Sequence, residues 1–344
     1  MDDGGFMDNT TYENCILVTD LDGTLLKPLS YDTNETIVSK DNREFLAEFI
    51  RGRGKVVLWS GHSIGVCDKI VAELARYMQV NASDLPVSII GRNGSVAKVR
   101  NSIVHNITIK PSVVSKVEGV VRRKDKEWKA KGIDEVSAFS VGGHSTPFMG
   151  HHVSGGEAAF VKAEHVIAKI FGNTASRYNA SDPKNAEAYI NIVNDEEFKQ
   201  ASRLANEIVV FSTDKDKNVD IIKAILGECG DSVEMANSFE LISKGQNKVN
   251  TLVELVKIID PIAKSEVIII GDGKRDISAI TFEHAELRKR SKLGLGFAIR
   301  TIGEDGSVTN SDVIESVKPA HVVDFVYEIK PKINSALKAK YMAP

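Results

Sequence analysis

The chain has 344 residues, of which 42% are hydrophobic and 26% are charged, and its formal net charge is −3. This composition is typical of a soluble globular protein, and the length predicts about two domains. The slightly acidic balance gives no reason to expect nucleic acid or an anionic membrane as a partner, because both bind to basic faces. Three widely separated cysteines and a polar N-terminus without a signal-peptide pattern predict a cytoplasmic protein.

The first predicted elements follow a polar N-terminal tail, residues 1–13, which we expect to be flexible. Apolar runs rich in β-branched residues occur at 15–19, 55–59, 87–90 and 266–270. Such runs are typical of strands that are buried on both faces of a parallel sheet. Apolar residues at helical spacing predict amphipathic helices at 42–51, 63–78 and 247–259. Strands alternating with helices predict an α/β fold with a doubly wound, Rossmann-like parallel sheet.

The pattern changes between residues 109 and 238, which we predict to be an inserted α+β domain. Helical patterns occur there at 112–131, 157–171, 195–206 and 217–226, and strand-like runs at 136–141, 188–193, 208–212 and 232–235. A glycine- and histidine-rich stretch, 140–157, is predicted to be a mobile polar loop. The α/β core is then discontinuous and consists of residues 14–108 and 239–340.

Polar side chains follow all four predicted core strands at the point where each strand ends. Asp20, Ser60 and Asp272 come directly after a strand or one residue later, and Asn93 follows a Gly-Arg turn. Ligands of open parallel sheets bind outside the carboxyl ends of the strands. We therefore expect two carboxylates, a hydroxyl and an amide to meet at one edge of the sheet, where they form a site.

Four carboxylates are expected at this edge, from the segments Asp-Leu-Asp-Gly-Thr and Asp-Gly-Lys-Arg-Asp: Asp20, Asp22, Asp272 and Asp276. Their mutual repulsion would raise some of their pKa values unless a cation lies between them. Mg²⁺ suits a site with a few carboxylates, several waters and a substrate phosphate. Ser60 is placed to donate a hydrogen bond to such a phosphate, and Lys248 to add a positive charge.

Five segments together resemble the motifs of the haloacid dehalogenase superfamily, and more narrowly those of Cof-like sugar-phosphate phosphatases with a type IIB cap. They are VTDLDGTLL at 18–26, WSGHS at 59–63, IIGRNGS at 89–95, GQNK at 245–248 and IIIGDGKRD at 268–276. Their order and spacing agree with the family over nearly the whole chain, including a large cap between the second and third catalytic motifs. The resemblance implies a Mg²⁺-dependent phosphatase that acts on a small phosphate ester, a sugar phosphate, and whose cap selects the substrate.

The resemblance also implies a role for each matching residue. Asp20 attacks phosphorus to form an aspartyl phosphate, and Asp22 acts as general acid and then general base. Ser60 and Lys248 hold the transferring phosphoryl oxygens. The implied metal site is made of the side chains of Asp20, Asp272 and Asp276 and the backbone carbonyl of Asp22. Asp276 also supports the site from outside or orients Lys248. The implied substrate-binding residues are Thr24, Gly61, His62 and Asn93.

Two residues depart from the family pattern. His62 and Arg275 stand where Arg and Asn are usual, which affects the groups around the reacting atoms but removes no catalytic group. Lys244 is an alternative to Lys248. Two other functions stay open: a phosphosugar mutase, and a metabolite-binding protein that has lost catalysis on the same scaffold. The sequence does not indicate the oligomeric state.

Overall fold

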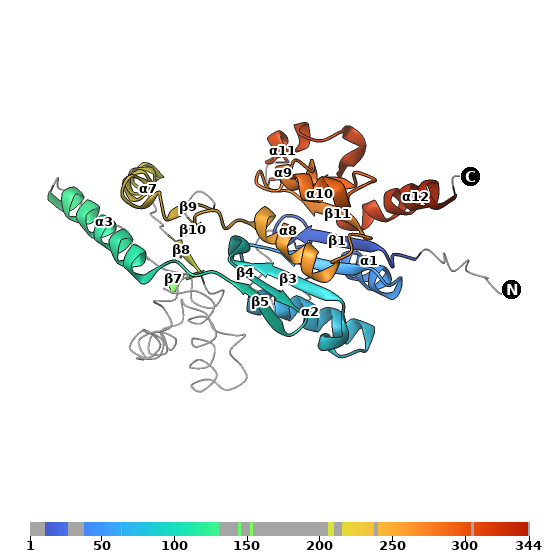
Figure 1. Cartoon of the computed structure of the whole chain (residues 1–344). Coiled ribbons are helices and arrows are strands. Elements are labelled where there is room, and N and C mark those ends of the chain that lie inside the picture. The colour runs from blue at the N-terminus through green and yellow to red at the C-terminus, as the bar shows by residue number, and fades with distance from the viewer. Residues whose placement is uncertain are drawn as a thin grey trace.

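A large sheet and smaller ones organise the described part of the chain (Figure 1). The computed structural model describes residues 11–26, 38–62, 64–130, 144–145, 152–153, 206–209, 215–236, 240–303 and 306–342. Within these residues the larger sheet has eight strands, a second sheet has three, and two short strands, β6 (His144–Ser145) and β7 (His152–Val153), pair with each other.

The eight-stranded sheet carries the predicted α/β core. Its strands, in spatial order, are β13 (Val322–Val323), β12 (Gly296–Ile299), β11 (Glu266–Gly271), β1 (Cys15–Asp20), β2 (Lys55–Trp59), β3 (Val87–Gly91), β4 (Val96–Val99) and β5 (Ser102–Asn106). Neighbours from β13 to β3 run parallel, which confirms the predicted doubly wound parallel sheet. Strands β4 and β5 extend it antiparallel. The sequence did not predict this extension, because β5 is mostly exposed and lacks an apolar run.

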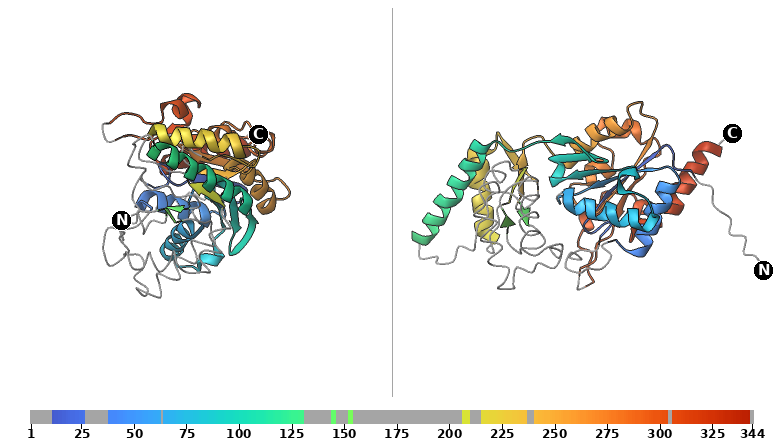
Figure 2. Two further views of the ribbon diagram at one scale, coloured as in Figure 1. Left: turned by 90° about the vertical axis from the view of Figure 1, so that its left-hand side faces the viewer. Right: turned by 90° about the horizontal axis from the view of Figure 1, so that it is seen from below.

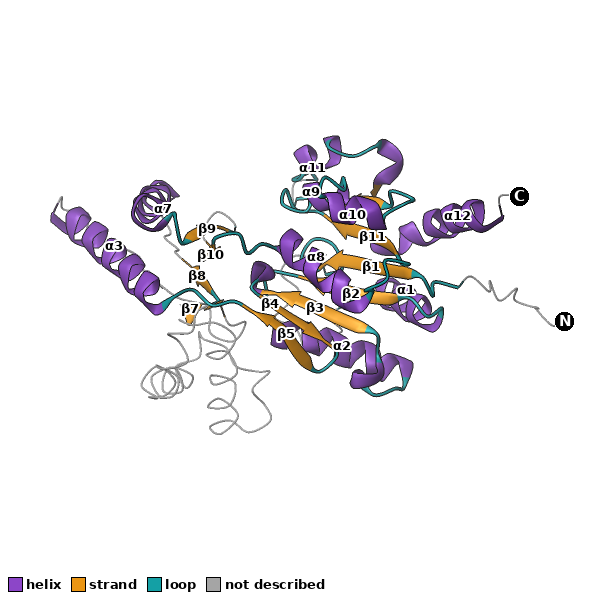
Figure 3. Cartoon of the chain, viewed as in Figure 1, coloured by secondary structure: helices purple, strands orange, loops and turns teal. Residues whose placement is uncertain are grey.

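Helices cover both faces of this sheet (Figure 3). Helices α1 (Lys40–Arg51), α2 (Ile64–Met78) and α12 (Ile329–Met342) pack on one face, and α8 (Lys248–Ile259), α9 (Ile277–Ile280) and α10 (Ala285–Arg290) on the other. Leu17 of β1 points to the first group, and Ile16 and Val18 point to the second. All three side chains are fully buried, which is worth about 1.5–3 kcal/mol each.

Short elements complete the core: α11 (Ser311–Glu315) and the 3₁₀ turns η2 (Ala82–Asp84), η3 (Arg92–Gly94), η5 (Pro319–His321) and η6 (Val326–Glu328). No helix in the described ranges is both long enough and apolar enough to cross a membrane.

The three-stranded sheet belongs to a third hydrophobic cluster, separate from the two on the faces of the large sheet. Its antiparallel strands are β8 (Glu207–Val209), β10 (Glu240–Ser243) and β9 (Val233–Met235). Helices α3 (Pro111–Ala130) and α7 (Lys215–Cys229) contribute buried residues to the same cluster. These helices lie at the opposite end of the molecule from α12 (Figure 2).

The division into a core and an inserted cap stays a prediction, as does the cap boundary at residue 238. Strand β10 lies beyond that boundary but pairs with β8 and β9, so the small sheet extends to Ser243. The predicted elements at 136–141, 157–171 and 188–193, and nearly all of the one at 195–206, lie outside the described residues. So do residues 1–10 of the predicted tail and most of the predicted loop at 140–157.

Candidate active site

The carboxyl edge of the large sheet brings Asp20, Ser60 and Asp272 together, as the ends of β1, β2 and β11 predict. Asp20 pairs in register with Trp59, the residue before Ser60, and Thr19 pairs with Ile270. Asp276 joins them from the loop that follows β11. Asp20, Asp272 and Asp276 each offer one carboxylate oxygen, and these three oxygens lie within 4.8 Å of one another.

Lys248 neutralises part of this negative charge. It is the first residue of α8, where Asn247 caps the helix by accepting a hydrogen bond from the backbone N–H of Asn250. Its ammonium lies 3.0 Å from Asp20 Oδ1 and 3.7 Å from Asp276 Oδ1. Burial lowers the pKa of Lys248, but the charges of Asp20 and Asp276 outweigh burial and raise it, so the amine is protonated at neutral pH.

Lys244, the alternative to Lys248, points elsewhere. Its ammonium donates to the backbone carbonyl of Gly230, 2.8 Å away, in an exposed position. Of these two lysines, only Lys248 makes an ion pair with Asp20.

Two hydroxyls hold the carboxylate of Asp272. Thr24 donates to Oδ1 at 2.9 Å and Thr301 donates to Oδ2 at 3.1 Å. The side-chain amide of Asn310 donates to the backbone carbonyl of Asp272 at 3.0 Å. Burial, and then the charge of Asp20, raise the pKa of Asp272 to about 6, although both threonine hydrogen bonds favour the ionised form. The predicted phosphate contact of Thr24 therefore competes with its contact to Asp272.

Asp276 is the most deeply buried carboxylate of the site, with 1% of its surface exposed. Its Oδ2 accepts a hydrogen bond from the backbone N–H of Gly273 at 3.1 Å. Burial raises the pKa of Asp276 well above its usual range, and Asp20 raises it further, while Lys248 opposes both. Gly271 leaves room for this carboxylate, because a Cβ there would lie 2.5 Å from Asp276 Oδ2.

The donor set fits a hard divalent cation. Three carboxylate oxygens converge, and the pKa values of two of the carboxyl groups are raised when no cation lies between them. Gly23 contributes to the close approach: its φ is +71°, and a Cβ there would lie 2.0 Å from Asp272 Oδ2. The side chain of Asp22 is not part of this cluster.

Asp22 faces His62 instead. Its Oδ2 lies 2.7 Å from His62 Nε2, and 48% of the Asp22 side chain is exposed. Burial opposes the charged form of His62, but the hydrogen bond and the charge of Asp22 outweigh burial and raise the pKa of His62. The backbone N–H of His62 donates to Ser60 Oγ at 3.0 Å. His62 therefore links the side chains of Asp22 and Ser60.

Asn93 lies at the interface between the two sheets. It adopts a left-handed conformation, with φ +53°, in the turn η3. Its amide nitrogen donates to Glu240 Oε2 at 2.7 Å and contacts Glu207 Oε2 at 3.4 Å. The neighbouring Arg92 donates to Glu207 Oε1 at 3.0 Å. The side chains of Arg92 and Glu207 are both fully buried. Gly61 packs against Asn93: a Cβ on Gly61 would lie 3.3 Å from the amide.

Four polar residues around the site were not predicted from the sequence. Thr301 and Asn310 hold Asp272, and Glu207 and Glu240 face the η3 turn from the small sheet. Only Thr301 had a signal that could have found it, because it follows the apolar run of β12 at the same sheet edge. The other three depend on contacts between distant segments.

Comparison with known proteins agrees with this arrangement. The model of the haloacid dehalogenase-like hydrolase family matches residues 17–287. No curated protein matches the sequence. A haloacid dehalogenase-like hydrolase from Bacteroides thetaiotaomicron has a similar solved structure, with a TM-score of 0.56 and 18% identity over 93% of this chain and 99% of that one.

Two further structures support the same fold. A HAD/COF-like hydrolase from Plasmodium vivax has a TM-score of 0.54 and 14% identity over 96% of each chain. A third protein, studied for a trigonal-bipyramidal intermediate in a phosphoryl-transfer superfamily, has a TM-score of 0.52 and 16% identity over 97% of this chain and 100% of that one. The chain therefore belongs to the haloacid dehalogenase-like hydrolases, as the five sequence motifs indicated.

Proposed function

We propose that this hydrolase is a Mg²⁺-dependent phosphatase that removes the phosphoryl group from a small phosphorylated metabolite, a sugar phosphate. The observation that carries the proposal is the position of Asp20, whose carboxylate lies 3.0 Å from the ammonium of Lys248 and beside Asp272 and Asp276. A nucleophile next to a fixed cation and a candidate metal site suits phosphoryl transfer, in which positioning and charge stabilisation supply most of the catalysis. The fold shared with a protein of a phosphoryl-transfer superfamily agrees with it.

In the first step an oxygen of Asp20 attacks phosphorus, and the bond from phosphorus to the ester oxygen breaks. The electron pair stays on the ester oxygen, which takes a proton from Asp22. In the second step Asp22 accepts a proton from water as the water attacks phosphorus, and the bond to Asp20 breaks, releasing inorganic phosphate. Asp22 suits proton transfer because its side chain is half exposed and lies outside the carboxylate cluster.

The remaining site residues bind and orient the ester. Lys248 and Ser60 hold the phosphoryl oxygens, and Thr24 contributes through its contact with Asp272. Gly61, His62 and Asn93 surround the ester on the side of the small sheet. The cation would be held by Asp20, Asp272, Asp276 and the backbone carbonyl of Asp22. When bound, Mg²⁺ supplies positive charge that offsets the repulsion between these carboxylates and the phosphate.

Hydrolysis of p-nitrophenyl phosphate tests the proposal. The parent should release phosphate with Mg²⁺ and not with a chelator, and Asp20→Asn should abolish release because the neutral amide cannot form the phosphoenzyme. Asp41→Asn, the same change at an exposed position of α1, should leave the rate unchanged.

A selective cap can reject a generic ester, so a panel of sugar phosphates is the decisive arm of the experiment. If the folded, Mg²⁺-loaded parent hydrolyses none of them, the phosphatase proposal is wrong. Binding without turnover would then favour the metabolite-binding alternative, and transfer of the phosphoryl group between positions of one sugar would favour the mutase.

A further inference from the structure

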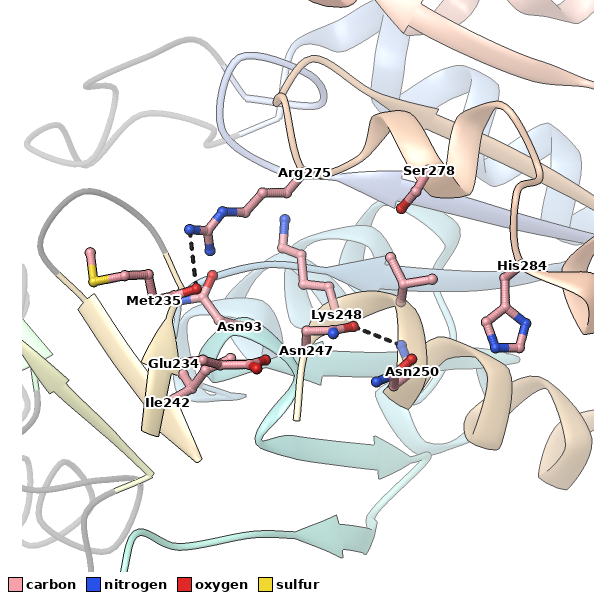
Figure 4. Close-up of a pocket in the computed structure, with 11 residues that line it drawn as sticks. Asn93, Glu234, Met235, Ile242, Asn247, Lys248, Asn250, Arg275, Ser278 and His284 are labelled. Carbon is pink, nitrogen blue, oxygen red and sulfur yellow. Dashed lines mark hydrogen bonds between the residues drawn. The ribbon is translucent and has the colours of Figure 1, made fainter. Parts of the chain in front are cut away.

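A pocket of about 410 Å³ lies next to Lys248, between the core and the small sheet (Figure 4). Its walls come from the η3 turn, strands β9 and β10, the start of α8, and the segment that runs from the loop before α9 to the start of α10. The lining residues are Asn93, Glu234, Met235, Ile242, Asn247, Lys248, Val249, Asn250, Arg275, Ser278 and His284. Amide, hydroxyl and charged groups face this space beside apolar side chains such as Met235, Ile242 and Val249, so the pocket suits a small molecule with both polar and apolar parts.

Lys248 and Arg275 are the lysine and arginine side chains that line the pocket. Lys248 is already paired with Asp20 and Asp276. Its charge therefore belongs to the place where the ester phosphate is proposed to bind, which is called the phosphoryl site below. Figure 4 shows Arg275 reaching from the loop before α9 toward Met235 of β9, and the side chain of Lys248 extending toward the same end of the pocket. The pocket thus joins the phosphoryl site to a second cation.

Arg275 uses little of its hydrogen-bonding capacity. Within the described part of the chain its guanidinium makes one hydrogen bond, to the carbonyl of Met235 at 3.4 Å, and no ion pair. Its neighbour Lys274 contrasts with it, since that ammonium lies 3.0 Å from Asp312 Oδ2. A guanidinium has five N–H donors in a planar fork that matches carboxylate and phosphate oxygens. Among the described residues, most of the donors of Arg275 therefore have no protein acceptor and can bind a ligand.

The charges of Glu240, Asp276 and Glu234 act on Arg275, but among the described residues none of these carboxylates forms an ion pair with it. Asp276 is held by Lys248 and by the backbone N–H of Gly273, and Glu240 accepts from Asn93. Glu234 lines the pocket itself and makes no ion pair with Arg275 among the described residues. A carboxylate acceptor at this place suits the hydroxyl groups of a polyol, while the guanidinium suits an oxyanion.

We propose that Arg275 determines specificity by binding a second anionic group, a carboxylate or a phosphate, on the substrate whose ester phosphate lies at Asp20 and Lys248. This inference rests on the proposed function and names its substrate class: small phosphate esters that carry another oxyanion. Arg275 takes no part in bond making or breaking.

Binding to an inactive background tests this without turnover. In Asp20→Asn protein with Mg²⁺, calorimetry compares two matched pairs: glycerol phosphate with phosphoglycerate, and fructose monophosphate with fructose bisphosphate. At least one doubly anionic member should bind about 10- to 100-fold more tightly than its partner, the range for charge-assisted hydrogen bonds. Adding Arg275→Gln should remove that preference, because the doubly anionic member should lose about 10- to 100-fold in affinity and the monoester much less. Lys274→Gln, the same change one residue away, should keep the preference.

Three results would overturn the inference: no preference for the second anion in either pair, equal losses in R275Q and K274Q, or an equal loss of affinity for both members of each pair in R275Q. The last result would mean that Arg275 only holds β9 against the loop between β11 and α9, through its hydrogen bond to Met235. The phosphatase proposal is judged separately, by Mg²⁺-dependent turnover of the parent. The two proposals can therefore fail independently.

Discussion

At the scale of single residues, the candidate metal site depends on side chains that do not belong to any recognisable motif. Thr301 is the clearest case, because its hydroxyl donates to Asp272 Oδ2 while Thr24 donates to Oδ1. Hydrogen bonds to both oxygens hold the Asp272 carboxylate in one orientation. They also favour its ionised form, against the opposing effects of burial and of Asp20. Groups that orient metal ligands in this way typically contribute 10- to 100-fold to affinity or activity.

We expect Thr301→Val to weaken Mg²⁺ activation by about 10-fold, because Asp272 loses one of its two hydroxyl partners. The Mg²⁺ concentration that gives half-maximal ester hydrolysis measures this effect. Thr309→Val is the matched control, since the Thr309 hydroxyl donates to the backbone carbonyl of Thr301 and does not contact Asp272. An unchanged Mg²⁺ requirement in T301V would show that Thr24 alone orients the carboxylate.

At the scale of elements, the position of Lys248 depends on how closely the η3 turn approaches α8. Gly94 has φ +101°, and a Cβ on it would lie 2.4 Å from the carbonyl carbon of Asn247. The hydroxyl of Thr251 in α8 donates to the carbonyl of Gly94 at 2.6 Å. The absence of a side chain at Gly94 therefore sets where α8 begins, and with it where Lys248 meets Asp20.

We expect Gly94→Ala to destabilise the protein by more than about 2 kcal/mol and to lower the rate of ester hydrolysis, because the methyl group would push the start of α8 away. Gly245→Ala is the control: Gly245 has φ +78°, but a Cβ there meets nothing within 4 Å. It should cost only about 1–2 kcal/mol of backbone strain. Urea denaturation measures the free energy of unfolding of both variants. If G94A and G245A lose the same amount, the close approach of Gly94 to the start of α8 does not contribute to stability.

At the scale of the whole molecule, the two sheets meet through polar contacts. Arg92 and Glu207 form a fully buried ion pair, and Asn93 reaches both Glu207 and Glu240. Desolvation offsets most of the attraction within a buried ion pair, so the pair adds little net stability. A charge left buried without its partner is strongly destabilising, so such contacts favour one arrangement of the two sheets over others. The turn that follows β3 therefore helps to set how the small sheet lies against the large one.

The sequence predicted the parts of this architecture that depend on neighbouring residues. Asp20 and Asp272 were found because each follows an uninterrupted apolar strand, and Lys248 because it follows a glycine at the start of an amphipathic helix. The interface was not predicted, since Arg92 and Glu207 are 115 residues apart and neither lies in a periodic pattern. Contacts between distant polar residues leave no local trace in one sequence.

The interface should make stability depend on pH through Glu240. Burial, and then repulsion by Glu207, raise the pKa of Glu240 to about 7. The folded protein therefore binds this proton more tightly than the unfolded chain, in which the carboxyl group titrates near its ordinary pKa of about 4.3. Ionisation consequently costs stability, and the free energy of unfolding should fall as pH rises from about 4 to about 7.

Glu240→Gln removes this cost and keeps an acceptor for the amide of Asn93. We expect E240Q to be more stable than the parent by about 1–3 kcal/mol at pH 8 and nearly equal to it at pH 4, as measured by urea denaturation of the metal-free protein. Glu44→Gln, at an exposed position of α1, should show no such change with pH. If E240Q were less stable than the parent at pH 8, the ionised carboxylate would contribute net attraction to Arg92 and His62, and repulsion by Glu207 would not control the interface.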